Sequence, residues 1–287
     1  MRRNLVGVLL FCGLLATALV GQAREDYLDI FVARVKAEKR FDFDRLSTKM
    51  ADVNRKNKGD NWVAYEQVYG EHNVVYFVSG RSNYGAIDTA MQAFESALGK
   101  GLGAGAAKLF ADFSQTVVST RSEVRRRRLD LSASVPGDAA GAAKMLGEAR
   151  YVRTFIVRVR PGRAPDYEAQ LKTNKEAQER GNPGIPILIS QSSAGQVGTV
   201  YYITTLAKSM ADFDKVKPLP EVLGSQGYAR YMKVVSEAVM GTESLIGKIL
   251  PAISNPAPEV AAADPKFWNP GPPPPPPPPK KSEAPKK

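Results

Sequence analysis

The stretch Asp29-Ile-Phe-Val-Ala-Arg-Val35 has a near copy in Arg153-Thr-Phe-Ile-Val-Arg-Val159, in the second half of a chain of 287 residues. The two segments share a phenylalanine, an arginine and a final valine at matching positions. Alternation of apolar and other residues is typical of a β-strand, and an arginine inside such a strand is unusual. Two copies of the same unusual strand indicate an internal repeat.

The alternation separates two faces of each predicted strand. We expect Arg34 and Arg158 to point into the interior between two sheets. The opposite faces, which we expect to pack against helices, carry the apolar residues Phe31, Ala33, Val35, Phe155, Val157 and Val159.

The segments that follow each copy predict the same order of elements, βαββαβ, in both halves. In the first half we expect strands near residues 27–36, 62–69, 74–79 and 123–131, and helices near 42–59, 82–98 and 105–119. In the second half we expect strands near 154–160, 185–193, 198–206 and 244–253, and helices near 165–180, 210–214 and 226–240. Matching pairs such as Val75-Tyr76 and Val200-Tyr201 keep the halves in register. The predicted fold class is α+β, with two tandem ferredoxin-like units packed as a single-chain α+β barrel.

Two βαββαβ units in tandem resemble the dimeric α+β barrel superfamily, which includes antibiotic-biosynthesis-type monooxygenases and NIPSNAP-like proteins. The resemblance covers roughly residues 27–253 and rests on element order and matching pairs. It implies two sheets that face each other and, in some members, a small molecule bound between sheet and helices. Some members oxidise that molecule without a cofactor, and we expect no cofactor here. Haem-using relatives need a histidine at the iron, and the only histidine, His72, falls in a predicted turn between strands.

The composition of the two ends predicts segments outside the barrel. Residues 1–23 combine two arginines, a short apolar run and small residues, as a secretory signal peptide does. We therefore expect an exported protein, periplasmic or extracellular, with a first ferredoxin-like unit at 24–135 and a second at 136–255. Residues 256–287 are rich in proline and lysine and are expected to form a disordered tail.

Charge and cysteine content narrow the function classes. The formal net charge of +11 describes a basic protein, which favours anionic neighbours. The only cysteine, Cys12, lies inside the predicted signal peptide, so disulfides, thiolate catalysis and cysteine-metal sites are excluded for the mature chain. No His/Asp/Glu cluster has the spacing of metal ligands, and we expect no metal.

The candidate ligand-binding residues are Arg34, Trp62, Tyr65, Glu66, Tyr76, Arg158 and Tyr201. A buried arginine needs an acceptor, and Glu66 is the candidate partner of Arg34. Arg158 has no matching carboxylate, because Gln191 stands at the corresponding position. The two arginines either tie the halves together or hold an anionic group of a ligand. The aromatic residues either fill the core or line a small-molecule pocket.

Two further segments have alternative interpretations. Arg125, Arg126, Arg127 and Arg128 fall on a predicted edge strand, where charge discourages unwanted pairing. Alternatively, this run and the lysine-containing tail dock an anionic cell-envelope polymer. The glycine-rich segment 99–105 lacks the context of a phosphate-binding loop and is expected to be a flexible joint. We expect no nucleic-acid partner, because the sequence has no RNP-like aromatic segment.

Three functional hypotheses remain open. The leading one is an exported, non-catalytic protein that binds a small molecule or an anionic ligand inside the barrel. The second is a cofactor-free monooxygenase acting on an aromatic or quinone-like substrate, and the third is a structural envelope protein tethered by its tail. A pocket lined by Tyr65, Tyr76 and Tyr201 favours the first two, and a filled interior favours the third. We expect a monomer or a homodimer.

Overall fold

The computed structural model describes residues 26–181 and 184–269. Eight strands form one closed barrel in the order β1-β3-β2-β8-β5-β7-β6-β4, and every neighbouring pair is antiparallel. The predicted signal peptide at 1–23 and the run of prolines and lysines after residue 269 lie outside the described residues.

The repeat predicted from the sequence is present in the order of elements. The first half contains β1 (Tyr27–Val35), α1 (Arg40–Lys56), β2 (Val63–Tyr69), β3 (Val74–Arg81), α2 (Tyr84–Leu102), α3 (Gly105–Ser114), β4 (Val117–Arg127) and α4 (Ala139–Gly147). The second half contains β5 (Tyr151–Val159), α5 (Ala164–Arg180), β6 (Ile187–Ala194), β7 (Thr199–Ala207), α6 (Leu219–Ala238), β8 (Val239–Ile249), α7 (Pro258–Ala263) and α8 (Pro265–Trp268). Short 3-10 turns occur at Ala37–Lys39, Met210–Lys215 and Pro251–Ile253. The chain is therefore an α+β protein in which each half contributes four neighbouring strands in the same spatial order.

Two seams join the halves and close the barrel. At the first, β2 pairs with β8, with Tyr65 opposite Ile249; at the second, β4 pairs with β6, with Arg126 opposite Gln191. A closed barrel has no edge strand. The prediction that the arginine run of β4 lies on an edge strand is therefore wrong, because β4 has β1 on one side and β6 on the other.

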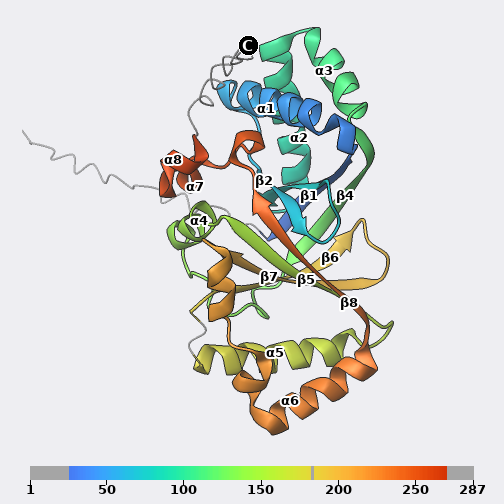
Figure 1. The fold of residues 1–287 in the computed structure, drawn as a ribbon, viewed down its shortest axis with the longest axis vertical. Helices are drawn as coiled ribbons and strands as arrows, with labels where there is room; N and C mark the ends of the chain where they lie inside the picture. The colour runs from blue at the N-terminus through green and yellow to red at the C-terminus, as the bar shows by residue number, and fades with distance from the viewer. Residues whose placement is uncertain (1–25, 182–183, 270–287) are drawn as a thin grey trace, which may run out of the picture.

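Helices cover opposite sides of the barrel, with α1, α2 and α3 on one side and α5 and α6 on the other (Figure 1). On the first side, Ala33 and Val35 of β1 pack in one core with Phe43 of α1. On the other side, Val157 and Val159 of β5 pack in a core with α5. The predicted helix-covering faces are confirmed, except that Phe155 remains 40% exposed. None of the described helices has the length and hydropathy needed to cross a bilayer.

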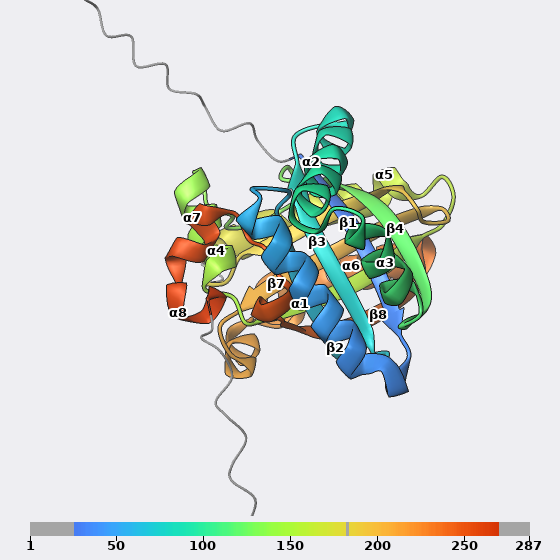
Figure 2. The same cartoon turned by 90° about the horizontal axis from the view of Figure 1, so that it is seen from above.

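A plug of three short helices, α4, α7 and α8, closes one end of the barrel; Figure 2 shows them gathered together on one side. Trp268 is 1% exposed, and its Nε1 donates a hydrogen bond to the Gly147 carbonyl at 2.8 Å. The plug packs in the same apolar core as inward-facing barrel residues such as Val152 and Ile249. The predicted disorder from residue 256 onward is therefore wrong for 258–268, because Val260 and Trp268 supply apolar surface that the barrel end buries.

Several element boundaries differ from the prediction. Strand β4 begins at Val117 and β8 at Val239, both earlier in the chain than expected. The added residues are mostly exposed at the start of each strand, so they carry no apolar alternation for sequence reasoning to detect. The glycine-rich joint is confirmed as the break between α2 and α3, where Gly103 has a φ of 54°.

The β2–β8 seam depends on one close approach, which gives a testable prediction. A Cβ at Gly247 would lie 2.3 Å from Cδ2 of Tyr65 across the seam. We expect Gly247→Ala to lower the free energy of unfolding by ~1–3 kcal/mol, the usual cost of overpacking a filled interior. Gly241→Ala on the same strand is the matched control, since nothing lies within 4 Å of its added Cβ. Equal stability of the two variants in urea unfolding would contradict the seam geometry.

Candidate functional site

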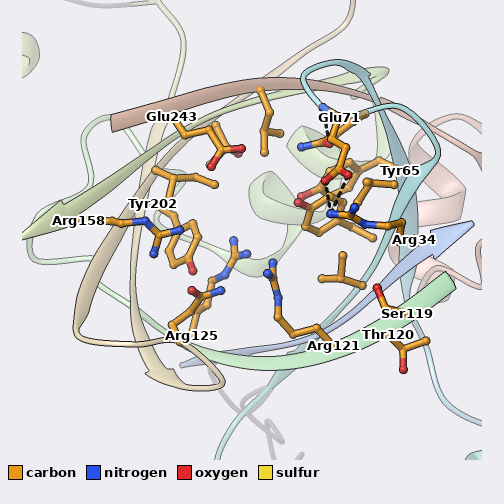
Figure 3. A pocket seen from close by; sticks show the side chains of 18 residues that line it. Arg34, Tyr65, Glu71, Ser119, Thr120, Arg121, Arg125, Arg158, Tyr202 and Glu243 are labelled. Carbon is orange, nitrogen blue, oxygen red and sulfur yellow. Dashed lines mark hydrogen bonds and ion pairs between the residues drawn. The ribbon is translucent and has the colours of Figure 1, made fainter. Parts of the chain in front are cut away.

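The barrel encloses a cavity of about 210 Å³ that is lined by strands from both halves (Figure 3). Its charged and hydroxyl-bearing lining residues include Arg34, Glu71, Arg121, Arg125, Arg158, Glu243, Tyr65, Tyr76, Thr154 and Tyr202. Apolar residues also contribute, among them Val32, Val74, Ile156 and Leu245. The interior is thus divided: apolar side chains pack against the helical plug, and charged side chains gather in the cavity.

A buried carboxylate, Glu123 of β4, organises one wall of the cavity. Its side chain is fully buried, and both of its oxygens are engaged. Arg121 Nη2 lies 2.6 Å from Oε1, and Gln196 Nε2 donates to the same oxygen at 2.8 Å. Arg125 donates to Oε2 from Nε at 3.0 Å and from Nη2 at 2.8 Å, and the Tyr202 hydroxyl donates to it at 3.2 Å. One carboxylate therefore positions two guanidinium groups.

The ionisation of this wall follows from those contacts. Burial alone raises the pKa of the Glu123 carboxyl, but the charge and hydrogen bonds of Arg125, with help from Arg121, outweigh it and hold the pKa below its usual value. Burial raises the pKa of Tyr202 to about 12, partly offset by Arg125, and it also raises the pKa of Tyr65. Glu123 is thus ionised at neutral pH, and the tyrosines are neutral hydroxyls.

Aromatic residues complete the wall. The rings of Tyr65 and Tyr76 stack with centroids 4.8 Å apart and an interplanar angle of 6°. The Arg125 guanidinium lies over the ring of Tyr202, with 3.4 Å from Cζ to the ring centroid. A cation over an aromatic face is attracted by the ring quadrupole. Tyr202 therefore stabilises the same position of the Arg125 guanidinium that the hydrogen bonds to Glu123 favour.

Arg34 has a partner other than the predicted one. Its Nη2 lies 2.7 Å from a carboxylate oxygen of Glu71, and both side chains are about half exposed at the cavity mouth. Glu66 instead forms an ion pair with Arg40 of α1. The predicted Arg34–Glu66 pair is wrong because Glu66 follows Tyr65, which faces inward, and consecutive strand residues face opposite sides.

Arg158 lines the cavity as predicted, and so does Glu243 of the neighbouring strand β8. Neither has a hydrogen-bond or ion-pair partner among the residues that the structure describes. Both are exposed to solvent at the mouth. Arg158 and Glu243 are therefore charged side chains that line the same cavity and are unpaired within the described residues.

The predicted placement of Tyr201 in the pocket is wrong. Its hydroxyl donates to Glu168 Oε1 of α5 at 2.6 Å, and its ring packs 5.3 Å from that of Tyr167 on the same helix. Tyr201 therefore belongs to the outer layer. Tyr202, the next residue, faces the cavity instead.

The strand register explains this error. Val32 stands opposite Tyr76 across β1 and β3, and its counterpart Ile156 stands opposite Tyr202 across β5 and β7. Tyr202 is thus the structural equivalent of Tyr76. The sequence alignment of Val75-Tyr76 with Val200-Tyr201 is displaced by one residue. A shift of one residue moves every side chain of a strand to the other face.

Trp62 also lies outside the cavity. Its ring packs edge-on against Phe94 of α2 at 5.7 Å, and its Nε1 donates to the Ile253 carbonyl at 2.8 Å. Of the predicted site residues, the cavity brings together Arg34, Tyr65, Tyr76 and Arg158. Their role in binding stays a prediction.

The arginine run does not form one basic surface. Arg125 is inside the barrel, whereas Arg128 is held outside it by Asp130, at 2.8 Å, and by Glu168. Arg126 is exposed, and Arg127 has a partner of its own. The arrangement lends no support to the predicted polymer-docking patch.

Sequence reasoning missed Arg121, Glu123, Arg125, Tyr202 and Glu243 as cavity residues. The alternation of Arg121, Glu123 and Arg125 is a period-two signal of one strand face. This alternation is not recognised when the strand is taken to begin at residue 123, because Arg121 then lies outside the strand.

The site does not fit a haem group held by histidine. His72, the sole histidine of the chain, is exposed in the turn between β2 and β3 and does not line the cavity. Within residues 26–181 and 184–269, no group of three His, Cys, Asp or Glu residues is placed to hold a metal ion.

Comparison with known proteins finds structural neighbours at low sequence identity. No protein-family model and no curated protein matches the chain. A provisionally named monooxygenase from Fusobacterium nucleatum has 9% identity and a TM-score of 0.50, covering 78% of this chain and 92% of its own. An anthrone oxidase-like protein has 12% identity and a TM-score of 0.49, with 79% and 93% covered. A heme-binding protein from Thermus thermophilus has 14% identity and a TM-score of 0.45, with 80% and 94% covered.

At 9% identity, the Fusobacterium structure shows likeness of fold alone. Together with the closed eight-stranded barrel, it confirms the fold-level resemblance to the dimeric α+β barrel superfamily.

The Glu123 network gives a prediction with a defined pH dependence. Because the folded-state pKa of Glu123 is lowered, its contribution to stability is present above the unfolded-state pKa of about 4.3 and is lost as the pH falls through the folded-state pKa. Glu123→Gln leaves two guanidinium groups without their counter-ion and should cost ~3–5 kcal/mol at pH 7. Urea unfolding at pH 7 and pH 3 should show this difference shrinking in acid.

Glu71→Gln is the control, since it removes a half-exposed pair worth about 1 kcal/mol or less. A Glu123→Gln variant as stable as Glu71→Gln at pH 7 would show that the buried carboxylate does not hold the wall together.

Proposed function

We propose that this protein is a non-catalytic binding protein for a small molecule with an anionic group, which it holds in the barrel cavity through Arg158. The observation that carries the proposal is an arginine at the cavity mouth that lines the cavity without a partner in the described structure. A guanidinium presents a planar fork of donors that matches a carboxylate or phosphate.

The charge balance of the cavity supports an anionic ligand. Arg34 is neutralised by Glu71, and Glu123 neutralises only one of the two arginines that contact it. With Arg158 and Glu243 added, the cavity keeps one net positive charge. An anionic group that pairs with Arg158 is therefore attracted by a net positive, partly enclosed site, where charges interact more strongly than in water.

The size of the cavity limits the ligand. About 210 Å³ is below the ~300–1,000 Å³ typical of pockets for drug-sized molecules. Apolar residues such as Ile156 and Leu245 offer a surface for a short hydrocarbon part. The ligand we propose is therefore a compact molecule with a charged head. The presence of a cavity also favours a binding protein over a purely structural one.

Cofactor-free oxidation has less support from the geometry. Removing a proton from a substrate needs a base that is free to accept it. Of the cavity carboxylates, Glu123 has both oxygens engaged and a lowered pKa, and Glu71 is paired with Arg34. Glu243 is unpaired among the described residues but exposed to solvent at the mouth, and it lies beside Arg158 rather than in a buried cleft. The hydroxyls of Tyr65 and Tyr202 carry raised pKa values and therefore stay protonated at neutral pH.

We also propose that the protein works outside the cytoplasm. Support comes from the sequence of residues 1–23, which has the features of a secretory signal peptide. Amino-terminal sequencing of protein from a secreting host should find a mature chain that begins near Arg24. A full-length chain retained in the cytoplasm would contradict this placement.

Titration calorimetry with a small carboxylate tests the binding proposal. Isovalerate is expected to bind to the wild-type protein, whereas the neutral isovaleramide is not, because only the carboxylate can pair with Arg158. Arg158→Gln should weaken isovalerate binding about tenfold or more, the loss expected for one charged hydrogen-bonded contact. Arg126→Gln, the same change on an exposed outer residue, is the control and should bind as the wild type does. Equal affinities of the wild type and Arg158→Gln would refute the proposal.

A further inference from the structure

The internal repeat allows the two halves of the cavity to be compared position by position. Val32 of β1 stands opposite Arg121 of β4, and Ile156 of β5 stands opposite Glu243 of β8. Because Val32 and Ile156 are equivalent residues of the two copies, Glu243 occupies the place that Arg121 has in the first half. The charge at this position is therefore reversed.

In the first half, each cavity arginine contacts a carboxylate of the same half, and Arg121 and Arg125 share one. Arg34 pairs with Glu71 of the β2–β3 turn at 2.7 Å. Arg121 pairs with Glu123 of its own strand at 2.6 Å. The first half therefore leaves neither of these two cations open to a ligand.

In the second half, the turn carboxylate is replaced by an amide. The β2–β3 turn and the β6–β7 turn each contain a glycine with positive φ, Gly70 at 125° and Gly195 at 82°. The residue after each glycine lines the cavity, Glu71 in the first turn and Gln196 in the second. Gln196 donates a hydrogen bond to Glu123 on the paired strand β4 and leaves Arg158 without a counter-ion from the turn.

The strand carboxylate is also replaced. Leu245 lies two residues after Glu243 in β8, just as Glu123 lies two residues after Arg121 in β4. An apolar residue therefore stands where the first half has its buried carboxylate. The second half thus retains two charges of opposite sign, Arg158 and Glu243, and has lost both internal partners found in the first half.

These two charges do not neutralise each other directly. Arg158 stands opposite Gly241, two residues before Glu243 on the adjacent strand, so the two side chains are diagonal neighbours. No ion pair joins them, although both line the same cavity, as Figure 3 shows for their labelled side chains. Both are exposed, so they stay hydrated when the site is empty, and a ligand that replaces this water can meet both.

We infer that the ligand is a zwitterion, a small amino-acid-like molecule whose carboxylate pairs with Arg158 and whose ammonium group pairs with Glu243. This inference rests on the proposed binding function and adds the second charge. A simple anion satisfies Arg158 and brings its negative charge near Glu243, whereas a zwitterion satisfies both residues. Preference for a zwitterion over an anion of the same shape is thus the expected signature of the site.

Calorimetry with matched probes tests the inference. L-valine and 4-aminobutyrate carry both charges, close together in the first and further apart in the second. Isovalerate and isobutylamine carry one charge each on the hydrocarbon skeleton of valine. At pH 7 at least one zwitterion should bind about tenfold or more tightly than isovalerate, and isobutylamine should not bind measurably.

Two variants assign the charges to residues. Glu243→Gln should weaken zwitterion binding about tenfold and leave isovalerate binding as tight or tighter, because the repelling carboxylate is gone. Arg158→Gln should weaken binding of zwitterions and isovalerate alike. Glu95→Gln, an exposed residue of α2 away from the cavity, should change neither.

The outcomes separate this inference from the proposal on which it rests. If isovalerate binds as tightly as both zwitterions and Glu243→Gln has no effect, the inference of a zwitterionic ligand is refuted. The proposed binding of an anion is then still supported. Failure of all three carboxylate-bearing probes to bind would overturn both.

Discussion

Backbone pairing across two seams, β2 with β8 and β4 with β6, is the constraint on which the rest of this structure depends. Each half alone is a four-stranded sheet with two open edges and an inner face that is partly apolar. Unpaired strand edges and exposed apolar faces are both unfavourable in water. Closing one sheet on the other removes all four edges at once and encloses an interior. The cavity exists because the halves meet in this way, and its lining is drawn from both.

The enclosed interior has two ends of different chemistry. At one end, α4 and α7 pack against each other so closely that a Cβ at Gly147 would lie 2.3 Å from the Val260 carbonyl oxygen. These helices follow β4 and β8, the equivalent last strands of the two halves, so both copies contribute to the plug. Trp268 is buried at this end, and the exposed charged residues that line the cavity lie toward the other end.

Charged residues inside a barrel are costly unless they are paired. In the first half, the cavity arginines are paired with Glu71 at the mouth and with the buried Glu123 on β4. The second half keeps the arginine of the repeated strand but has neither carboxylate. A repeat that is symmetric in backbone is therefore asymmetric in charge, and the asymmetry produces one open subsite rather than two. This difference is the physical basis for assigning the ligand to the half that contains Arg158.

The sequence by itself determined the repeat, the α+β class, the βαββαβ order of each half and the inward direction of Arg34 and Arg158, because these follow from local periodicity. It did not determine the plug helices α4, α7 and α8, which form where the closed barrel gives their apolar residues a surface to cover. The predicted pairing of Arg34 with Glu66 was inconsistent with a cavity-facing Tyr65, because neighbouring strand residues face opposite sides. Only the tertiary structure decided that Tyr202 rather than Tyr201 faces the cavity, because register is set by pairing between distant strands and one residue reverses the face. It also decided that Arg34 meets Glu71 while Arg158 meets no carboxylate of the described residues, because ion pairs depend on which turns and strands the closed barrel brings together.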